Sequence, residues 1–451
     1  MSGAIGKLLI GAAVLAWSAT FSSFAADASD DNDPPAGLLG DMGGLRPALA
    51  RHGTTLGLTE ASEITGNLHG GLRRGAAYRG LTTLNVTVDT GKAGAWPGGT
   101  WFASALQIHG RQFTQEHVGS FHTASNLEAH NATRLWELWY RHQLNDEVDL
   151  KIGQQSIDQE FIINTSASGF AAAYFGWPAL PSVDLPASGG VYPLASPGVR
   201  LRAKLSDTST VLAGVLAGDA ANSSTQDPQV ANAHGTTFSL HGGTLVIAEY
   251  QYARKQGLPG SYKFGAWHHS KRFADQRFDA QGLSQADPAS NAGMAQHRGN
   301  YSVYAVADQT VWRASGDGPR AVNLFGRAMA APGDRNLVSF SANLGVTVSA
   351  PFEQRAHDLL GIGLAYLKLG SRAIALDRDI NAFNGTFVPV RSHEALLETT
   401  YQYQVAPWWM LQGIFQYTFR PGAGALDPAD PTRTRRIPNA TVLGVRTSIT
   451  F

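Results

Sequence analysis

The chain has 451 residues, with 35 Lys and Arg balanced by 35 Asp and Glu, and it contains no cysteine. The balanced charge argues against nucleic acid as a partner, and without disulfides the stability must come from packing and backbone pairing. With 50 glycines and only 16% charged residues, the chain is too apolar for disorder and too often interrupted for long helices, so short strands joined by polar turns are predicted.

The N-terminal residues have the pattern of a secretory signal peptide. Lys7 precedes an apolar run over residues 8–17, and small residues follow up to a cleavage position after Ala25. The run is well short of the roughly 20 residues that span a bilayer, which argues against an anchoring helix. Residues 1–25 are therefore predicted to be a cleaved export signal.

Two short segments are expected between the signal and the body of the protein. Residues 26–36 are acidic and end in Pro34 and Pro35, and they are predicted to form a mobile leader. Residues 37–53 are predicted to hold a short helix, capped at Asp41 and ended by Gly53. A helix of this length is marginal alone, so it is expected to pack against the rest of the chain.

From about Thr54 onward the dominant pattern has a period of two. In residues 338–349, apolar residues such as Phe340 and Leu344 alternate with polar residues such as Ser341 and Asn343. Such alternation predicts a strand with one apolar and one polar face. The same pattern recurs in residues 397–405, 411–420 and 443–451 and, less cleanly, in many segments before them.

Two architectures suit such strands. A soluble sandwich would turn the apolar faces into a core, whereas a membrane barrel would turn them to lipid and its polar faces to a water-filled lumen. Strand segments of about ten residues match a tilted membrane crossing. Aromatic residues gather near strand ends, as at Trp136, Tyr140 and Trp408-Trp409, where interfacial girdles are expected. The chain also ends on Phe451 within a strand, as expected of an exported barrel that offers an aromatic C-terminal strand to the assembly machinery.

The predicted fold is therefore all-β, a closed antiparallel transmembrane β-barrel over residues 54–451. Closure follows because an unpaired strand edge facing hydrocarbon costs several kcal/mol per backbone group. The chain length favours about 16 strands, with 18 as the alternative, and barrels of this size enclose an aqueous channel.

Strand parity predicts which side chains line the channel. If the apolar Leu84 faces lipid, Arg79 on the alternate positions of the same strand faces the lumen. Likewise, outward Val199 and Leu201 place a basic row, Arg200, Arg202 and Lys204, on the inward face. Outward Trp136 places Glu137 inward. The predicted lining set is Arg79, His109, Arg111, Glu137, Trp139, Arg141, Arg200, Arg202, Lys204, Glu249, Glu398 and Arg446. An inward charge is more often part of a solvated wall or a structural ion pair than a selectivity contact. The basic row has the best case for a share in the constriction.

Motifs for other chemistry are weak. His122 and Ser125 lack a nearby Gly-x-Ser-x-Gly motif and an acid partner, and the neighbouring His268 and His269 would point to opposite strand faces. No phosphate-binding loop or dinucleotide motif is present. The sequence predicts no catalytic residue, cofactor or metal site, and an outer-membrane lipid hydrolase remains a remote alternative.

Four blocks in order resemble the OprB-type carbohydrate-selective porins. They are GLLGDMGGLRPALARHG (37–53), GGLRRGAAYRG (70–80), KIGQQSIDQEF (151–161) followed by FGWPALPSVDLP and SPGVRLRAKL, and ETTYQYQVAPWWMLQGIFQYTFRPG (398–422) closed by VLGVRTSITF. The resemblance implies a roughly 16-stranded barrel in the outer membrane of a Gram-negative bacterium, through which sugars diffuse into the periplasm. At residues 408–412 the family often has PDLQY where this chain has WWMLQ, and residues 190–300 match poorly. The identity of the sugar therefore stays open.

The predicted function is passive, selective diffusion of mono- or oligosaccharides across the outer membrane, with the N-terminal helix on the periplasmic side. A general or anion-preferring porin is the nearest alternative, because a row of Arg and Lys also suits anions. A structural barrel or adhesin is another. Expected partners are the sugars, outer-membrane lipid and the barrel-assembly machinery. The oligomeric state, monomer or trimer, stays open.

Overall fold

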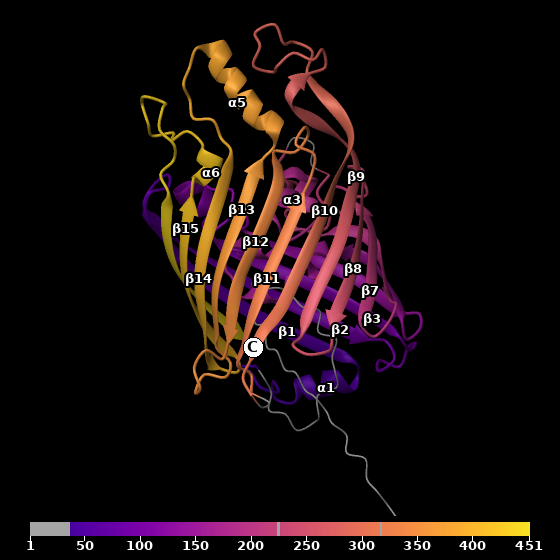
Figure 1. The fold of residues 1–451 in the computed structure, drawn as a ribbon. Coiled ribbons are helices and arrows are strands. Elements are labelled where there is room, and N and C mark those ends of the chain that lie inside the picture. The colour runs from indigo at the N-terminus through magenta and orange to yellow at the C-terminus, as the bar shows by residue number, and fades with distance from the viewer. Residues whose placement is uncertain (1–36, 223–225, 316–317) are drawn as a thin grey trace, which may run out of the picture.

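The fold is a single closed antiparallel β-barrel, in which the first strand pairs with both the second and the last (Figure 1). The structure is a computed structural model that describes residues 37–222, 226–315 and 318–451. The predicted signal peptide and acidic leader lie outside the described residues. The barrel has 16 strands, which confirms the predicted fold class and decides between 16 and 18.

The strands are β1 (Thr54–His69), β2 (Gly75–Asp89), β3 (Gly99–Gly110), β4 (Ala132–Gln143), β5 (Val148–Gln155), β6 (Ser196–Lys204), β7 (Ser209–Ala217), β8 (Thr244–Arg254), β9 (Gly260–Asp279), β10 (Met294–Arg313), β11 (Ala321–Ala330), β12 (Val338–Ser349), β13 (Leu359–Leu369), β14 (His393–Ala406), β15 (Trp409–Phe419) and β16 (Ala440–Thr450). The helices are α1 (Leu45–Arg51), α2 (Ala173–Gly176), α3 (Ala179–Asp184), α4 (Pro228–Ala231), α5 (Ser371–Asn384) and α6 (Pro421–Gly424), with short 3₁₀ or π turns at Thr114–Val118, Ile157–Gln159, Ser166–Gly169 and Pro186–Gly189. Among the described residues, no helix is both long and apolar enough to cross a membrane.

The two ends of the barrel differ in the length of their connections. At the end that holds α1 and the C-terminus, at the bottom of Figure 1, strands join through short segments such as 144–147, 205–208 and 407–408. We call this the turn end. At the opposite end, the loop end, the connections are much longer and include residues 111–131, 156–195, 218–243, 370–392 and 420–439.

At the turn end, the N-terminal segment pairs with the end of the last strand. The Leu38 N–H donates to the Thr450 carbonyl at 2.8 Å, and the Arg46 side chain donates to the Phe451 carbonyl. Gly37 lies so close that a Cβ there would sit 2.6 Å from the Phe451 oxygen. α1 lies within residues 37–53, where a short helix is expected, but its N-cap is Gly44 and not Asp41. It packs against β1 and, through Arg46, contacts Phe451, which gives so short a helix the support it needs.

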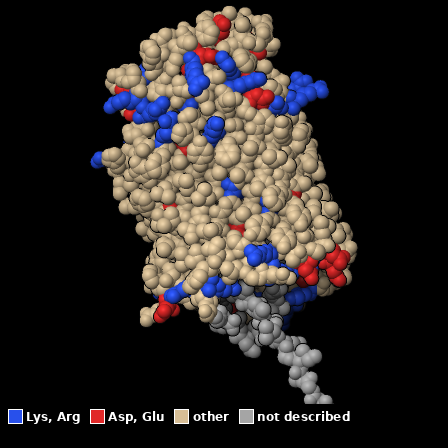
Figure 2. All heavy atoms as spheres, in the orientation of Figure 1, with Lys and Arg blue, Asp and Glu red and all other residues tan. Residues whose placement is uncertain are grey.

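The outward faces of the strands are apolar. Val199, Leu201, Val215, Phe264 and Leu344 all point away from the barrel and are 37–61% exposed. In Figure 2 a broad belt with few charged residues separates charged rims at the two ends of the barrel. The polar partners of the alternation, such as Ser341 and Asn343 of β12, face inward and are buried. The alternation therefore has the direction that a membrane barrel requires.

Part of the inner wall is apolar as well, because it packs against loops inside the barrel. Leu212, Ile247 and Trp267 of β7, β8 and β9 face inward and pack with Ile162 and Leu180 of the β5–β6 connection. Strands that are apolar on both faces show no alternation, which is why the pattern weakens in this part of the sequence.

A bulge in β4 overturns one parity assignment. The β3–β4 register shifts so that Ser104 pairs with Glu137 and Ala105 with Leu135, which leaves Trp136 as the extra residue. Trp136, expected on the outside in an aromatic girdle, is fully buried inside the barrel, and its indole N–H donates to the Leu194 carbonyl at 3.1 Å. A bulge reverses the parity of every residue beyond it, and nothing in the local sequence announces it.

Candidate functional site

The middle of the barrel is narrowed by the connection between β5 and β6, residues 156–195, which folds into the lumen. Three inward carboxylates on β8, β10 and β14 hold it by accepting hydrogen bonds from its backbone N–H groups. The bonds are Ile162 to Glu249 (2.7 Å), Thr165 and Ser166 to Asp308 (3.1 and 2.8 Å), and Ala171 and Ala172 to Glu398 (2.6 and 2.8 Å). The N–H groups that an irregular segment leaves unpaired are thereby satisfied without water.

One arginine satisfies the carbonyls of the same loop. Arg327 on β11 donates through Nη1 to the Ile162 and Gly176 oxygens at 3.1 and 2.7 Å, and through Nη2 to the Tyr174 and Phe175 oxygens at 2.7 and 3.2 Å. Its side chain is buried, with 4% exposure of the residue. Arg327 and the three carboxylates together fix the backbone of the loop in the lumen.

A second connection, residues 111–131 between β3 and β4, also folds inward. Glu394 on β14 accepts hydrogen bonds from the Phe121 and His122 N–H groups at 3.0 and 2.7 Å and from His122 Nδ1 at 2.6 Å. Arg446 on β16 donates to Ser125 Oγ and Asn126 Oδ1 at 3.2 and 2.9 Å. Both loops therefore enter the lumen and are held there by side chains of the barrel wall.

A buried charge cluster supports this second loop. Glu63 on β1 accepts from Arg79 at 2.8 Å and from Arg446 at 2.6 Å, and its side chain has no exposed surface. Arg79 also donates to Thr65 Oγ1 at 2.8 Å. Glu63 thus bridges two arginines of the predicted lining set, and Glu128 adds a second carboxylate 4.0 Å from Arg79. Both arginines lie inside the wall, covered by other residues.

The basic row of β6 is neutralised by carboxylates. Arg200 is buried and pairs with Asp149 of β5 and with Glu160 of the β5–β6 loop, the latter at 3.0 Å. Arg202 also bonds Asp149, yet 45% of its side chain is exposed to the lumen. Lys204 is 49% exposed and pairs with Asp207 at 2.8 Å at the turn end. Arg202 and Lys204 therefore border water, whereas Arg200 is a structural ion pair.

Of the predicted lining residues on β4, two are buried and one is half-buried. Glu137 is buried and accepts from the Ser156 N–H at 2.9 Å, so it holds the start of the loop. Trp139 faces inward, stacks on Phe102 with ring centroids 4.8 Å apart, and is 6% exposed. Arg141 is half-buried, with Nη2 3.4 Å from Thr100 Oγ1, and lies toward the turn end near Arg202.

His109 lies on the outer face, contrary to the predicted inward position. Its neighbour Ile108 is the buried, inward residue, and His109 bonds outward Tyr78 at 3.0 Å and Gln107 at 2.8 Å. The strand has polar side chains on both faces, so its parity was ambiguous. Arg111 is exposed just beyond the loop-end terminus of β3.

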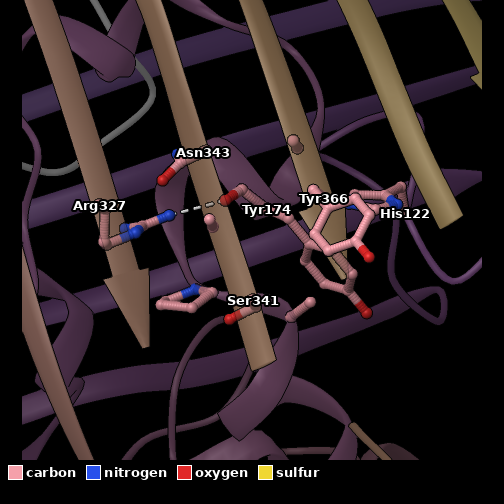
Figure 3. A pocket seen from close by; sticks show the side chains of 10 residues that line it. His122, Tyr174, Arg327, Ser341, Asn343 and Tyr366 are labelled. Atoms are coloured by element: carbon pink, nitrogen blue, oxygen red, sulfur yellow. Dashed lines mark hydrogen bonds between the residues drawn. The ribbon is translucent and has the colours of Figure 1, made fainter. Parts of the chain in front are cut away.

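A small cavity lies between the two inserted loops and the wall formed by β11, β12 and β13 (Figure 3). Its lining includes His122, Tyr174, Arg327, Ser341 and Asn343. This is a small space, with room for about one water molecule. Figure 3 shows these side chains converging from the loops and from the strands.

Several polar atoms around this cavity lack a partner within the protein. They are Ser341 Oγ, both amide atoms of Asn343, and His122 Nε2, and all are buried. Burial raises the pKa of Tyr174, so its hydroxyl stays protonated and keeps a donor. Buried polar groups without partners indicate a polar occupant, either water or a solute with hydroxyl groups.

Sequence reasoning assigned no functional role to most of the residues that hold or line this region: Glu63, Asp149, Asp308, Arg327, Ser341, Asn343 and Glu394. A signal existed for Ser341 and Asn343, which occupy the polar face of the cleanest alternating strand. For Glu63 and Arg327 there was none, because their partners are distant in the sequence or are backbone groups.

The exposure of Arg202 leads to a prediction about ion selectivity. Replacing Arg202 with glutamine is expected to lower the anion-to-cation permeability ratio by about twofold at low salt, because one lumen cation is lost while Arg200 still neutralises Asp149. Reversal potentials across planar bilayers measure this ratio. His109→Gln, on the outer face, is the matched control and should leave the ratio unchanged. An equal shift in both variants would contradict the luminal position of Arg202.

Comparison with known proteins agrees with this architecture. Residues 73–451 match the family model described as carbohydrate-selective porin, OprB family. Porin B of Pseudomonas aeruginosa is 24% identical over 437 residues, which cover 92% of this chain and 91% of that protein. The putative porin QuiX of Acinetobacter baylyi is also 24% identical, over 87% of this chain and 90% of that protein.

The fold is likewise similar to a solved structure. The high-pH structure of OprB from Pseudomonas putida superposes with a TM-score of 0.81 at 22% identity, covering 94% of this chain and all of the other. The low-pH structure of the same protein gives a TM-score of 0.55. The family match covers most of the chain, so the protein is an outer-membrane channel and not an enzyme. The chain belongs to the OprB family of carbohydrate-selective porins.

Proposed function

We propose that sugars cross the barrel one at a time along a narrow passage that runs past the polar side chains of Ser341 and Asn343. In this proposal the loop end faces the outside of the cell, and the turn end, with α1, faces the periplasm. Short periplasmic turns and long external loops are usual for outer-membrane barrels, and the connections of this barrel divide in that way.

The polar lining supports a hydroxyl-rich substrate. Asn343 presents both a donor and an acceptor, and Ser341 Oγ and His122 Nε2 add further unpartnered atoms around the cavity. Tyr174 places an aromatic ring at the same cavity, and a ring suits the apolar face of a sugar. These groups would replace water lost from the sugar, and because they are few the binding would stay weak enough for release.

The charge arrangement argues against the anion-preferring alternative. Asp149 and Glu160 pair with Arg200, and Asp207 pairs with Lys204, so the basic row is matched by carboxylates along its length. At the cavity itself, the unpartnered atoms belong to Ser341, Asn343 and His122, and His122 bonds Glu394. Arg327 also lines the cavity, but its N–H groups are taken up by four loop carbonyls. We therefore propose a neutral mono- or oligosaccharide as the substrate.

The decisive experiment titrates sugars against single channels in planar bilayers. Glucose or a disaccharide is expected to reduce the ion conductance in a saturable manner, and Asn343→Leu is expected to weaken this block about tenfold. The amide contributes two hydrogen bonds at roughly 0.5–1.5 kcal/mol each, and leucine fills a similar volume without them. The measured quantity is the half-blocking sugar concentration.

Gln107→Leu is the matched control, because it removes the same amide from the outer face of β3, where no sugar should pass. Equal sugar block in the Asn343→Leu variant and the unaltered protein would remove the cavity from the pathway. Strong anion selectivity without sugar block would favour the alternative porin, and a channel that never conducts would contradict both.

A further inference from the structure

A groove lies on the outward surface of the barrel, apart from the lumen. It is formed by the loop-end parts of β9 and β10 and lined by His268, Ser270, Arg272, Arg298 and Gly299. His268, Ser270 and Arg272 alternate along β9 with the buried, inward His269, so they share its outward face. The groove therefore opens toward the surroundings of the barrel.

The groove carries two arginines without a counter-charge. Arg272 and Arg298 are direct register partners across the two strands, and both are exposed. In the described parts of the chain, no carboxylate lies within 4.0 Å of either guanidinium and neither donates a side-chain hydrogen bond, whereas Arg277 and Arg335 near them are each paired with an aspartate. Two adjacent like charges repel each other, so the pair is favourable only with an anion between them.

A bulge turns Arg298 toward the outside. The register shifts between Arg298 and Asn300, and Gly299 adopts a φ of 70° there. Beyond the bulge Asn300 is fully buried and inward, and without the extra residue Arg298 would share that inward face. The Gly299 carbonyl accepts a hydrogen bond from Arg335 at 3.0 Å, which holds the bulge in place. Bulges of this kind re-aim side chains.

The height of the groove matches the outer edge of the hydrocarbon layer. Tyr252 and Tyr262 stack near the turn end, with ring centroids 6.4 Å apart, in the position of an interfacial girdle. Ten residues along β9 separate Tyr262 from Arg272. At a rise of about 3.3 Å per residue and a tilt of about 40°, this spans about 25 Å, the height of the apolar band of such barrels.

Apolar side chains occupy the same outward face below the groove. Phe264 is 61% exposed, Val303 60% and Tyr301 53%, and their outward position is that of residues that meet acyl chains. The two arginines follow directly above them. Headgroup phosphates of a bilayer lie at this level, and guanidinium groups bind phosphate oxygens through paired N–H donors.

We propose that this groove binds a phosphate group of the glycolipid that forms the outer leaflet of the outer membrane, lipopolysaccharide, with Arg272 and Arg298 on either side of the phosphate and its acyl chains against Phe264, Tyr301 and Val303. The assignment rests on the proposed orientation, with the loop end outside. A membrane lipid is the occupant, and not free phosphate, because the groove continues directly into the lipid-facing surface. The site is outside the lumen and independent of transport.

The test uses the full-length channel in nanodiscs of phosphatidylcholine that contain either lipid A with both phosphates or chemically dephosphorylated lipid A. Native mass spectrometry counts the retained lipid A, and titration gives its affinity. The unaltered protein is expected to retain the phosphorylated form and not the dephosphorylated one. Arg272→Gln together with Arg298→Gln is expected to weaken retention on the order of tenfold or more, since each basic residue contributes to headgroup binding.

Arg254→Gln provides the control, because Arg254 is exposed at the turn end of neighbouring β8. It should bind lipid A as the unaltered protein does, and the conductance of all three proteins should be equal. Equal retention of lipid A by the double variant would overturn the proposal. So would retention of the dephosphorylated form, or competition by inorganic phosphate at millimolar concentration, which would make the site one for a soluble anion.

Discussion

Replacing Arg327 with alanine is expected to raise the single-channel conductance severalfold and to abolish sugar block. The variant loses four hydrogen bonds to the carbonyls of the loop that narrows the barrel, at Ile162, Tyr174, Phe175 and Gly176. Unsatisfied buried carbonyls cost about 1–3 kcal/mol each, so this part of the loop should leave the wall and admit water. Conductance and sugar titration in planar bilayers measure both effects.

Arg327→Lys is the informative companion, because lysine keeps the charge but lacks the two-pronged guanidinium that spans four oxygens. It should give an intermediate conductance. Heat-modifiable migration on gels confirms that each variant still forms a closed barrel. An intact Arg327→Ala barrel with unchanged conductance would show that the carboxylates Glu249, Asp308 and Glu398 hold the loop without help from arginine.

The second large effect is expected at Glu63. Glu63→Ala leaves buried Arg446 without a carboxylate partner and leaves Arg79 with Glu128 alone, at 4.0 Å. Breaking a buried ion pair by removing one partner costs about 3–5 kcal/mol. The free energy of unfolding, measured by urea titration of the protein in lipid vesicles, should fall by that amount. Glu63→Gln should lose less, because an amide oxygen still accepts a hydrogen bond from one arginine.

Glu60→Gln is the matched control on the same strand. Glu60 lies on the outer face and accepts hydrogen bonds from Ser62 on one oxygen and from Thr82 on the other, and the amide keeps one of these two acceptors. Its loss should therefore stay below about 1 kcal/mol. Similar destabilisation of the Glu60→Gln and Glu63→Ala variants would mean that the buried charge cluster contributes no more to the free energy of unfolding than a carboxylate on the outer face does.

The barrel was predictable from the sequence because its strongest signal is local. In β12 the alternation places Ser341 and Asn343 on one face and Phe340 and Leu344 on the other, and the structure has the same division. The prediction of inward and outward faces was wrong at two residues. The bulge at Trp136 reverses the face of that residue. The prediction for His109 was wrong because β3 carries polar side chains on both faces, which leaves its alternation ambiguous.

The interior could not be predicted to the same extent, because its arrangement depends on contacts between distant segments. Strand parity places Glu249 and Glu398 on the inward face. Only the folded loop shows that they accept hydrogen bonds from backbone N–H groups far away in the sequence, 87 positions away for Glu249 and 226 or 227 positions away for Glu398. Similarly, the sequence does not distinguish Arg200 from the other two cations of its strand, Arg202 and Lys204. Arg200 is buried because the β5–β6 loop places Glu160 beside it on the inner wall.

The attachment of the inserted loop has an evolutionary consequence. The carboxylates of β8, β10 and β14 bind main-chain N–H groups, which every amino acid except proline supplies. Substitutions along the loop can therefore exchange the side chains that meet a passing solute without detaching the loop from its frame. The substrate specificity of such a channel can therefore change through single substitutions in the loop, while the barrel and the attachment of the loop stay the same.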